Sequence, residues 1–140
     1  MKPSVIYLLD TNTAAYIING RSMAARRKLA AIDDHDRVAI SVITEAEIRY
    51  GLAKKPEATR WRMGMEEFLA SVTILPWDSE AARVYGTMRA AMAAQGKTLT
   101  TMDLLIASHA AALGAVLVTS DKAFHQAEGL FASVNWADDL

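Results

Sequence analysis

Short apolar runs rich in β-branched residues alternate along this chain with longer segments whose apolar residues recur at helical spacing. The short runs cover residues 5–9, 38–41, 72–75 and 115–118, with a fifth, weaker run at 133–135. The longer segments cover residues 13–18, 23–33, 43–50, 57–70, 79–94 and 102–113, with a short helical turn at 122–124. Continuous apolar strands that alternate with helices are typical of a parallel sheet covered on both faces. We therefore expect an α/β fold with three layers, α/β/α.

Glycines mark the ends of several predicted helices. A glycine just after a helical segment commonly ends the helix, because it adopts the left-handed backbone conformation without strain. The glycines in this position are Gly20, Gly51, Gly96 and Gly114. No linker, repeat or low-complexity tract divides the 140 residues, so we expect one domain spanning residues 1–140.

Composition narrows the class of protein. The chain has no cysteine, which excludes a disulfide framework and a Cys-ligated zinc site. No apolar run approaches the length that crosses a bilayer, and we expect a cytoplasmic protein without a membrane partner. The formal net charge of −1 lacks the basic character typical of nucleic-acid-binding proteins. A polyanionic partner must therefore be held by local basic patches or through a metal ion.

Two aspartates follow predicted strands directly. Asp10 comes where the run 5–9 passes into a helix, and Asp121 comes shortly after the run 115–118. Ligands of open α/β sheets bind at the carboxyl ends of the strands, which favours a functional role for both. The alternative is structural, since aspartate is also a common helix N-cap.

Two further acids lie on predicted helices that begin at the same sheet edge. At 100° per residue, Glu47 shares a face with Ile43 and Tyr50, whereas Glu45 lies about 200° away and is expected to face water. Asp103 lies in the first turn of the apolar segment 102–113, at the positive end of its dipole. A half-exposed Glu47 and a capping Asp103 are the structural alternatives.

Four carboxylates at one sheet edge would repel one another. Two unit charges 4 Å apart cost about 4 kcal/mol at an effective dielectric of 20. Such a cluster needs raised pKa values or a bound cation. All-oxygen ligands suit Mg²⁺ or Mn²⁺ rather than zinc.

Four sequence blocks together resemble those of the PIN-domain nucleases, and most nearly the VapC-type toxin ribonucleases of bacterial toxin–antitoxin pairs. The blocks are LLDTN at 8–12, SVITEAEIRYG at 41–51, TMDLLIASHA at 101–110 and VTSDKAF at 118–124. The resemblance covers essentially the whole chain. It assigns the family's four acids to Asp10, Glu47, Asp103 and Asp121, and supporting polar positions to Asn12 and Thr119.

The resemblance also implies a function. It implies a short, mostly parallel five-stranded sheet, a homodimer that can enter a larger toxin–antitoxin assembly, and an endoribonuclease that uses Mg²⁺ or Mn²⁺. Asp10 and Asp103 would be the inner metal ligands, with Glu47 and Asp121 acting directly or through water. A cognate antitoxin would hold the enzyme inactive by covering part of its surface and inserting a basic residue into the acidic pocket.

Local basic clusters are the candidate RNA contacts. They are Arg26-Arg27-Lys28, Lys54-Lys55, and Arg60 and Arg62 beside Trp61. Each is equally consistent with a solvated helix face. The apolar stripe of Trp61, Met65, Phe68 and Leu69 fits the core better than a groove for an antitoxin helix, although the resemblance favours the groove. His35, His109 and His125 share no ligand spacing and are expected to be structural or surface residues.

Two other functions remain open on the sequence. A phosphoryl-transfer domain that uses Mg²⁺ would also bring acids to a sheet edge. A dehalogenase-type phosphatase, however, needs an aspartate where Asn12 stands, and Asp78 is a poor match to the phosphate acceptor of a receiver domain. A PIN-like binding module without catalysis is disfavoured by the complete set of acids.

Overall fold

The computed structural model describes residues 3–127 and 129–140 and contains one five-stranded sheet. The strands are β1 (Ile6–Leu9), β2 (Arg37–Ser41), β3 (Thr73–Leu75), β4 (Val116–Val118) and β5 (Ala132–Val134). Their order across the sheet is β3-β2-β1-β4-β5, and every neighbouring pair is parallel. The expected α/β fold is confirmed, and its sheet is wholly rather than mostly parallel.

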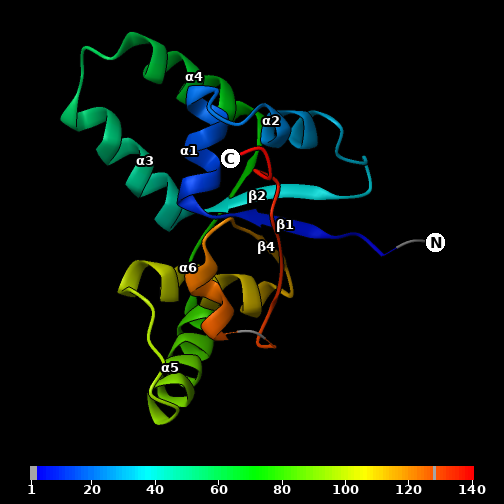
Figure 1. Ribbon diagram of the computed structural model, residues 1–140, viewed down its shortest axis with the longest axis vertical. Helices are drawn as coiled ribbons and strands as arrows, with labels where there is room; N and C mark the ends of the chain where they lie inside the picture. Colours follow the sequence, from blue (N-terminus) through cyan, green and yellow to red (C-terminus); the bar gives the residue numbers. More distant parts are fainter. Residues whose placement is uncertain (1–2, 128) are drawn as a thin grey trace.

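Seven helices in the described residues flank this sheet. They are α1 (Thr11–Asn19), α2 (Met23–Ala30), α3 (Val42–Lys54), α4 (Thr59–Ser71), α5 (Ser79–Ala94), α6 (Thr101–Leu113) and the 3₁₀-helix η1 (Lys122–Ala127). Figure 1 shows α1 to α4 on one side of the strands and α5 and α6 on the other. None of the helices in the part of the chain described here is long and apolar enough to cross a membrane.

Alternation along the central strands divides the core into two halves. In register, Leu8 on β1 pairs with Ala39 on β2 and Leu117 on β4, and these side chains pack under α5 and α6. The next residues along, Leu9 and Val118, pack under α1 and α4 instead. Because successive strand residues point to opposite faces, every central strand is buried on both sides. This accounts for the continuous apolar runs in the sequence.

The helix α3 differs from its prediction. It does not end at Gly51 but continues to Lys54. Gly51 lies close to the ring of Trp61 on α4, and Leu52 packs on the core beyond it. Packing of this last turn therefore outweighs the roughly 1 kcal/mol that glycine costs inside a helix.

Other helices also have shifted ends, among them α4, which begins at Thr59 rather than residue 57. The first helix begins at Thr11, two residues before the predicted start, because Asp10 caps it. The second ends at Ala30 rather than residue 33. By contrast, α5 spans the predicted residues 79–94.

We expect buried His109 to make the stability of the fold depend on pH. Its side chain is 1% exposed on α6, and burial lowers its pKa below the ordinary 6.5, although the charge of Asp78 and the Pro76 carbonyl oppose this shift. Below about pH 6.5 the unfolded chain therefore binds a proton that the folded chain resists, so stability falls as the pH drops. We expect His109→Gln to remove this part of the pH dependence of the unfolding free energy.

Denaturant unfolding between pH 7.5 and 5 measures the effect. The free energy of unfolding of the wild type should fall more steeply than that of H109Q as the medium is acidified. Parallel curves would mean that His109 titrates alike in both states.

Candidate active site

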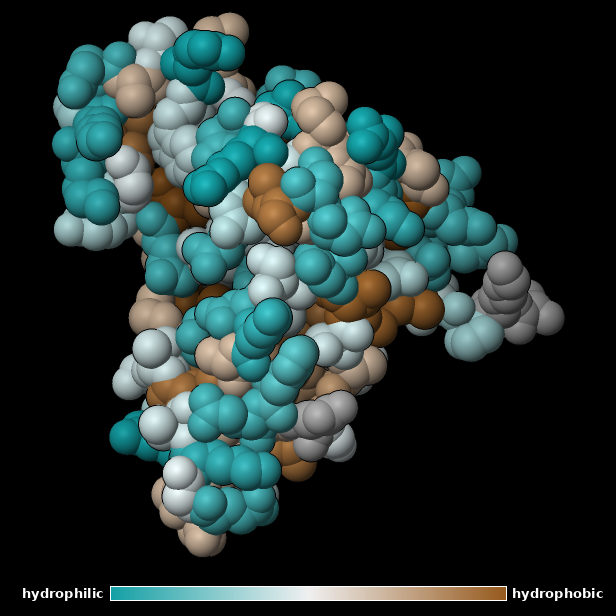
Figure 2. All heavy atoms as spheres, in the orientation of Figure 1, coloured by the Kyte–Doolittle hydropathy of each residue, from teal (hydrophilic) through white to brown (hydrophobic). Residues whose placement is uncertain are grey.

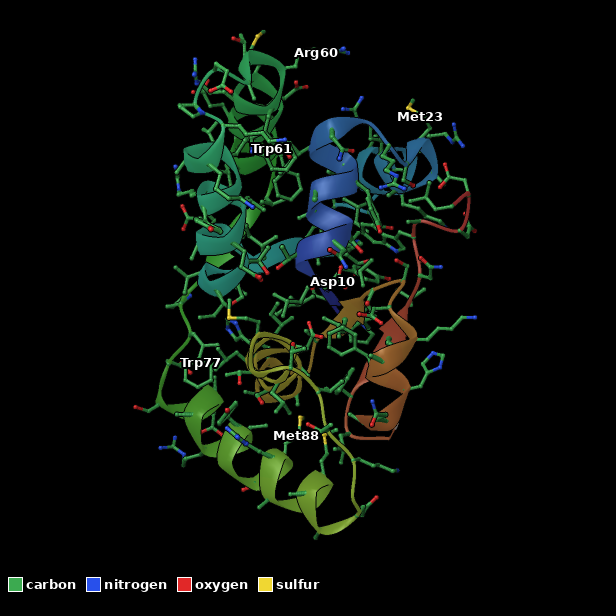
Figure 3. The ribbon with its side chains drawn as sticks, turned by 60° about the vertical axis from the view of Figure 1, so that its left-hand side comes forward. Asp10, Met23, Arg60, Trp61, Trp77 and Met88 are labelled. Atoms are coloured by element: carbon green, nitrogen blue, oxygen red, sulfur yellow. The ribbon has the colours of Figure 1, made fainter. Side chains whose placement is uncertain are left out.

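The candidate site lies where the strand order reverses. From β1 the chain moves outward through β2 and β3, and later returns to place β4 and β5 on the other side of β1. Such a switch point, at the carboxyl ends of the strands, is where open α/β sheets bind ligands. Asp10 follows β1 at this point, and Figure 3 shows it at the base of α1, beside α6 seen end-on.

Asp10 is fixed through both carboxylate oxygens. Oδ1 accepts a hydrogen bond from the backbone N–H of Thr13 at 2.8 Å, which makes Asp10 the N-cap of α1. Oδ2 accepts the hydroxyl proton of Thr119 at 2.6 Å, and the side chain is only 4% exposed. Asp10 is thus both the structural cap that its position suggested and a buried carboxylate at the sheet edge.

The surroundings of Asp10 disfavour its negative charge. Burial raises the pKa of its carboxyl above the ordinary value, and the charge of Asp103 adds to this rise. The hydrogen bonds from Thr119 and Thr13 lower the pKa in part. A carboxylate kept in such a place without a neutralising base is a candidate functional group.

Thr119 links Asp10 to Asp121. Its hydroxyl donates to Asp10 and accepts the backbone N–H of Asp121 at 3.0 Å. The Asp121 side chain in turn accepts the N–H of Ala123 at 2.9 Å. Asp121 is therefore a turn-forming residue as well as a half-buried acid at the end of β4.

Asp103 lies in the first turn of α6, but it does not cap that helix. The cap is Thr100, whose hydroxyl accepts the Asp103 N–H at 3.2 Å. Partial burial raises the pKa of the Asp103 carboxyl, the Thr100 hydroxyl lowers it, and the charge of Asp121 raises it further. The capping alternative is wrong for this residue, so its carboxylate is not required for that purpose.

Glu47 lies on α3 and is connected to the site by a hydrogen bond from Thr11, the first residue of α1. Its Oε1 accepts the hydroxyl proton of Thr11 at 2.5 Å, and Thr11 directly follows Asp10. The predicted helical face is partly wrong, since Tyr50 is exposed and Glu45 is half-buried in an ion pair with Arg49. The face that packs inward carries Thr44 and Ile48.

The structure therefore brings the four acids into one region, but their carboxylates are not clustered tightly around one point. The charge of Asp103 raises the pKa of Asp10, and the charge of Asp121 raises the pKa of Asp103. Glu47 is one hydrogen bond from the backbone that carries Asp10. As the side chains lie, no three Asp, Glu or His residues within 3–127 and 129–140 are grouped closely enough to hold a metal ion.

No basic side chain in the described part of the chain neutralises these acids through a salt bridge. The ion pairs there are Arg49 with Glu45 and Arg83 with Glu80, both within single helices. Asp10 is instead held by hydroxyl and N–H donors, which leave its charge in place. The region accordingly remains an unneutralised acidic surface.

Some candidate RNA contacts are occupied elsewhere. Arg26 donates to the Ile17 carbonyl at 2.9 Å and so helps to end α1, and Arg62 donates to the Pro56 carbonyl. The ammonium of Lys54 lies 4.8 Å from the centre of the Tyr50 ring. Figure 3 shows Arg60 at the far end of α4 from Asp10. The remaining candidates, Arg27, Lys28 and Lys55, are exposed.

The apolar stripe of α4 belongs mainly to the core. Met65 and Phe68 are buried, and Trp61 and Leu69 pack against the same cluster. Beside this helix lies a hollow of about 590 Å³. It is lined by residues of α1, α2, β2 and α4, including Ile17, Leu29, Val38 and Phe68, and by none of the four acids. Figure 2 shows a mostly hydrophilic outer face, with apolar side chains visible in the notch between the α3–α4 hairpin and α1.

Sequence reasoning missed the threonines that hold the acids. It selected Asn12 as the polar residue after Asp10, but the Asn12 side chain is exposed, and Thr11 and Thr13 make the contacts. The signal for Thr13 was present, because an N-cap aspartate accepts the N–H of the second or third helical residue. Thr11 and Thr44 become recognisable only once α1 and α3 are packed together.

The chain is similar in sequence to known proteins over nearly its whole length. A profile of the PIN domain matches residues 7–130. The chain is 33% identical over 133 residues to Ribonuclease VapC2 of Rickettsia felis, which covers 94% of this chain and 98% of that protein. It is 28% identical over 131 residues to the tRNA(fMet)-specific endonuclease VapC of Shigella flexneri, with 94% and 98% covered.

Solved structures of similar proteins have the same fold. VapBC2 from Rickettsia felis, bound to a DNA fragment from its promoter, matches with a TM-score of 0.87 at 31% identity, over 94% of this chain and 99% of that chain. DNA-bound VapBC from Salmonella typhimurium matches with a TM-score of 0.85 at 30% identity, over 94% and 98%.

Proposed function

Because the chain belongs to the PIN-domain family and is a VapC-type toxin ribonuclease of a toxin–antitoxin pair, we propose that its activity depends on Mg²⁺ or Mn²⁺. The ion would be held by Asp10, Glu47, Asp103 and Asp121 in one PIN domain that spans residues 1–140. The observation that carries this proposal is the buried, unneutralised carboxylate of Asp10 at the switch point of the sheet.

The side chains present fit a hard divalent cation. All four are oxygen donors, and the chain has no cysteine that would favour a softer metal. The mutual repulsion of Asp10, Asp103 and Asp121 would become attraction toward a shared positive charge. Since no three of the described acids are grouped for an ion as they lie, we infer that binding draws their side chains closer together.

Each acid has a distinct proposed role. Asp10 and Asp103 would be the inner ligands, and Glu47 and Asp121 would complete the site directly or through water. A cation held there would supply a coordinated water of lowered pKa and would neutralise charge on the scissile phosphate. Thr119 and Thr13 keep the Asp10 carboxylate in one orientation, which preserves its free lone pairs for the ligand.

The substrate and the partners extend the proposal. Transfer RNA is the first substrate class to test, because the Shigella flexneri relative is named for cleavage of tRNA(fMet). The complexes of similar toxins with their VapB proteins support a cognate antitoxin here. The hollow beside α4, which apolar side chains such as Ile17 and Phe68 line in part, is the surface that we propose receives a helix of it. A homodimer is proposed on the family resemblance alone.

Removal of divalent ions should abolish RNA cleavage. A chelator such as EDTA would leave the acids without a cation, and the attacking water would lose its activation. Cleavage of a mixed transfer RNA substrate, followed on a denaturing gel, should stop in EDTA and return when excess Mg²⁺ or Mn²⁺ is added.

The same assay separates the competing functions. Unchanged cleavage in EDTA would contradict metal dependence. Absence of cleavage with every ion tested, by protein that remains folded and free of antitoxin, would favour a binding module without catalysis.

A further inference from the structure

The Thr11 hydroxyl forms a hydrogen bond between α1, which Asp10 caps, and α3, which carries Glu47. Thr11 is the first residue of α1, directly after Asp10, and its hydroxyl meets the Glu47 carboxylate of α3 at 2.5 Å. A second hydroxyl, that of Thr44, lies 3.3 Å from the Thr11 oxygen. Thr44 belongs to α3 and is fully buried.

The direction of these hydrogen bonds follows from donor counting. A threonine hydroxyl has one proton to donate, whereas the Glu47 carboxylate has none. The Thr11 proton is used on Glu47 Oε1, so the contact between the two hydroxyls is donated by Thr44. The resulting chain runs from Thr44 to Thr11 to Glu47, and a hydroxyl that accepts a hydrogen bond becomes a stronger donor.

These hydrogen bonds restrain the side chain of Glu47, which would otherwise be free to change rotamer. Glu47 is half-buried and forms no salt bridge with a described residue. A free glutamate of this kind samples several rotamers, and fixing it costs entropy when a ligand binds. The hydrogen bond from Thr11 fixes the Glu47 rotamer when the protein folds, so this entropy is not lost again on ligand binding. It uses Oε1 and leaves Oε2 of Glu47 for the ligand.

We propose that Thr11 is a positioning residue, which with Thr44 presents Glu47 to the divalent ion. This inference rests on the metal site of the proposed function and adds to it a residue that neither binds the ion nor touches the RNA. Partners that orient metal ligands typically change metal affinity by about 10–100-fold when they are removed.

The test measures Mn²⁺ binding to metal-free protein by calorimetry, with cleavage as a second readout. Thr11→Val removes the hydroxyl at nearly constant volume, and we expect the Mn²⁺ dissociation constant to rise about 10-fold or more. Thr11→Ser keeps the hydroxyl and should bind as the wild type does. Thr44→Val should weaken binding in the same direction but less. Thr87→Val, which removes an exposed hydroxyl on α5, is the matched control.

A double-mutant cycle decides whether Thr11 acts through Glu47. In a Glu47→Ala background, Thr11→Val should have no further effect on Mn²⁺ binding. Wild-type affinity in T11V, or an equal loss from T11V with and without Glu47, would overturn the inference.

The cycle also separates this inference from the function on which it rests. If Asp10→Asn removes Mn²⁺ binding while Thr11→Val leaves it unchanged, the metal site stands and the positioning role is wrong. If the wild type binds no Mn²⁺, both are wrong. If T11V is too unstable to purify, the contrast between T11S and T44V gives the same decision.

Discussion

Asp10→Asn should reduce RNA cleavage by at least about 100-fold while the protein stays folded. The substitution removes the negative charge that we assign to the inner coordination of the cation, and groups that stabilise charge in a reaction typically contribute 10²–10³ in rate. The fold should survive because the new amide can still accept the Thr13 N–H and can donate to Thr119. Initial rates with saturating Mg²⁺ measure the loss, and thermal unfolding checks the fold.

A matched aspartate tests whether the location of the lost charge matters, because asparagine can still cap a helix in both variants. Asp78 caps α5 as Asp10 caps α1, accepting the Ala81 N–H at 3.1 Å, but it lies outside the acidic region. Asp78→Asn should cleave RNA at the wild-type rate. A similar loss in D78N and D10N would show that the effect does not depend on a charge at the switch point.

Gly64→Ala should destabilise the protein by about 1–3 kcal/mol, the usual cost of overpacking a core. Gly64 of α4 faces the end of α1, where an added Cβ would lie 2.5 Å from the backbone oxygen of Ile18. Backbone cannot move aside as a flexible side chain can, so the two helices must separate. Denaturant titration of the purified variant measures the change in unfolding free energy.

A second helical glycine serves as the control because the opposite sign is expected. Gly86 lies inside α5, and apart from its own stretch of helix no atom lies within 4 Å of the position that a Cβ would take. Gly86→Ala should therefore stabilise the protein by about 0.5–1 kcal/mol through reduced backbone freedom in the unfolded chain. Equal effects of the two substitutions would contradict the close packing of α1 on α4.

The sequence predicted the architecture well because burial on both faces leaves a strong pattern. Runs such as 5–9 and 115–118 cannot alternate apolar and polar residues when helices cover each side of the sheet. The continuation of α3 past Gly51 to Lys54 could not be predicted in the same way. It depends on the contact of that turn with Trp61, which is distant enough along the chain to leave no local signal.

The acids of the site could be predicted from the sequence, but the threonine hydroxyls that donate hydrogen bonds to them could not. Asp10 and Asp121 stand after strands, and that position alone indicates a shared sheet edge. Thr119 was selected only through a family resemblance, and Thr11 was not selected at all. A threonine contact between two helices depends on how they pack, as does the use of Arg26 to end α1 rather than to meet RNA.

The most direct measurement of the central claim is the position of Mn²⁺ in crystals of the wild-type protein, found by its anomalous scattering. We expect one or more peaks bonded to carboxylate oxygens of Asp10 and Asp103, with Glu47 and Asp121 drawn in around them. Crystals that contain Mn²⁺ only at surface carboxylates away from Asp10, or none at high concentration, would contradict the proposed site.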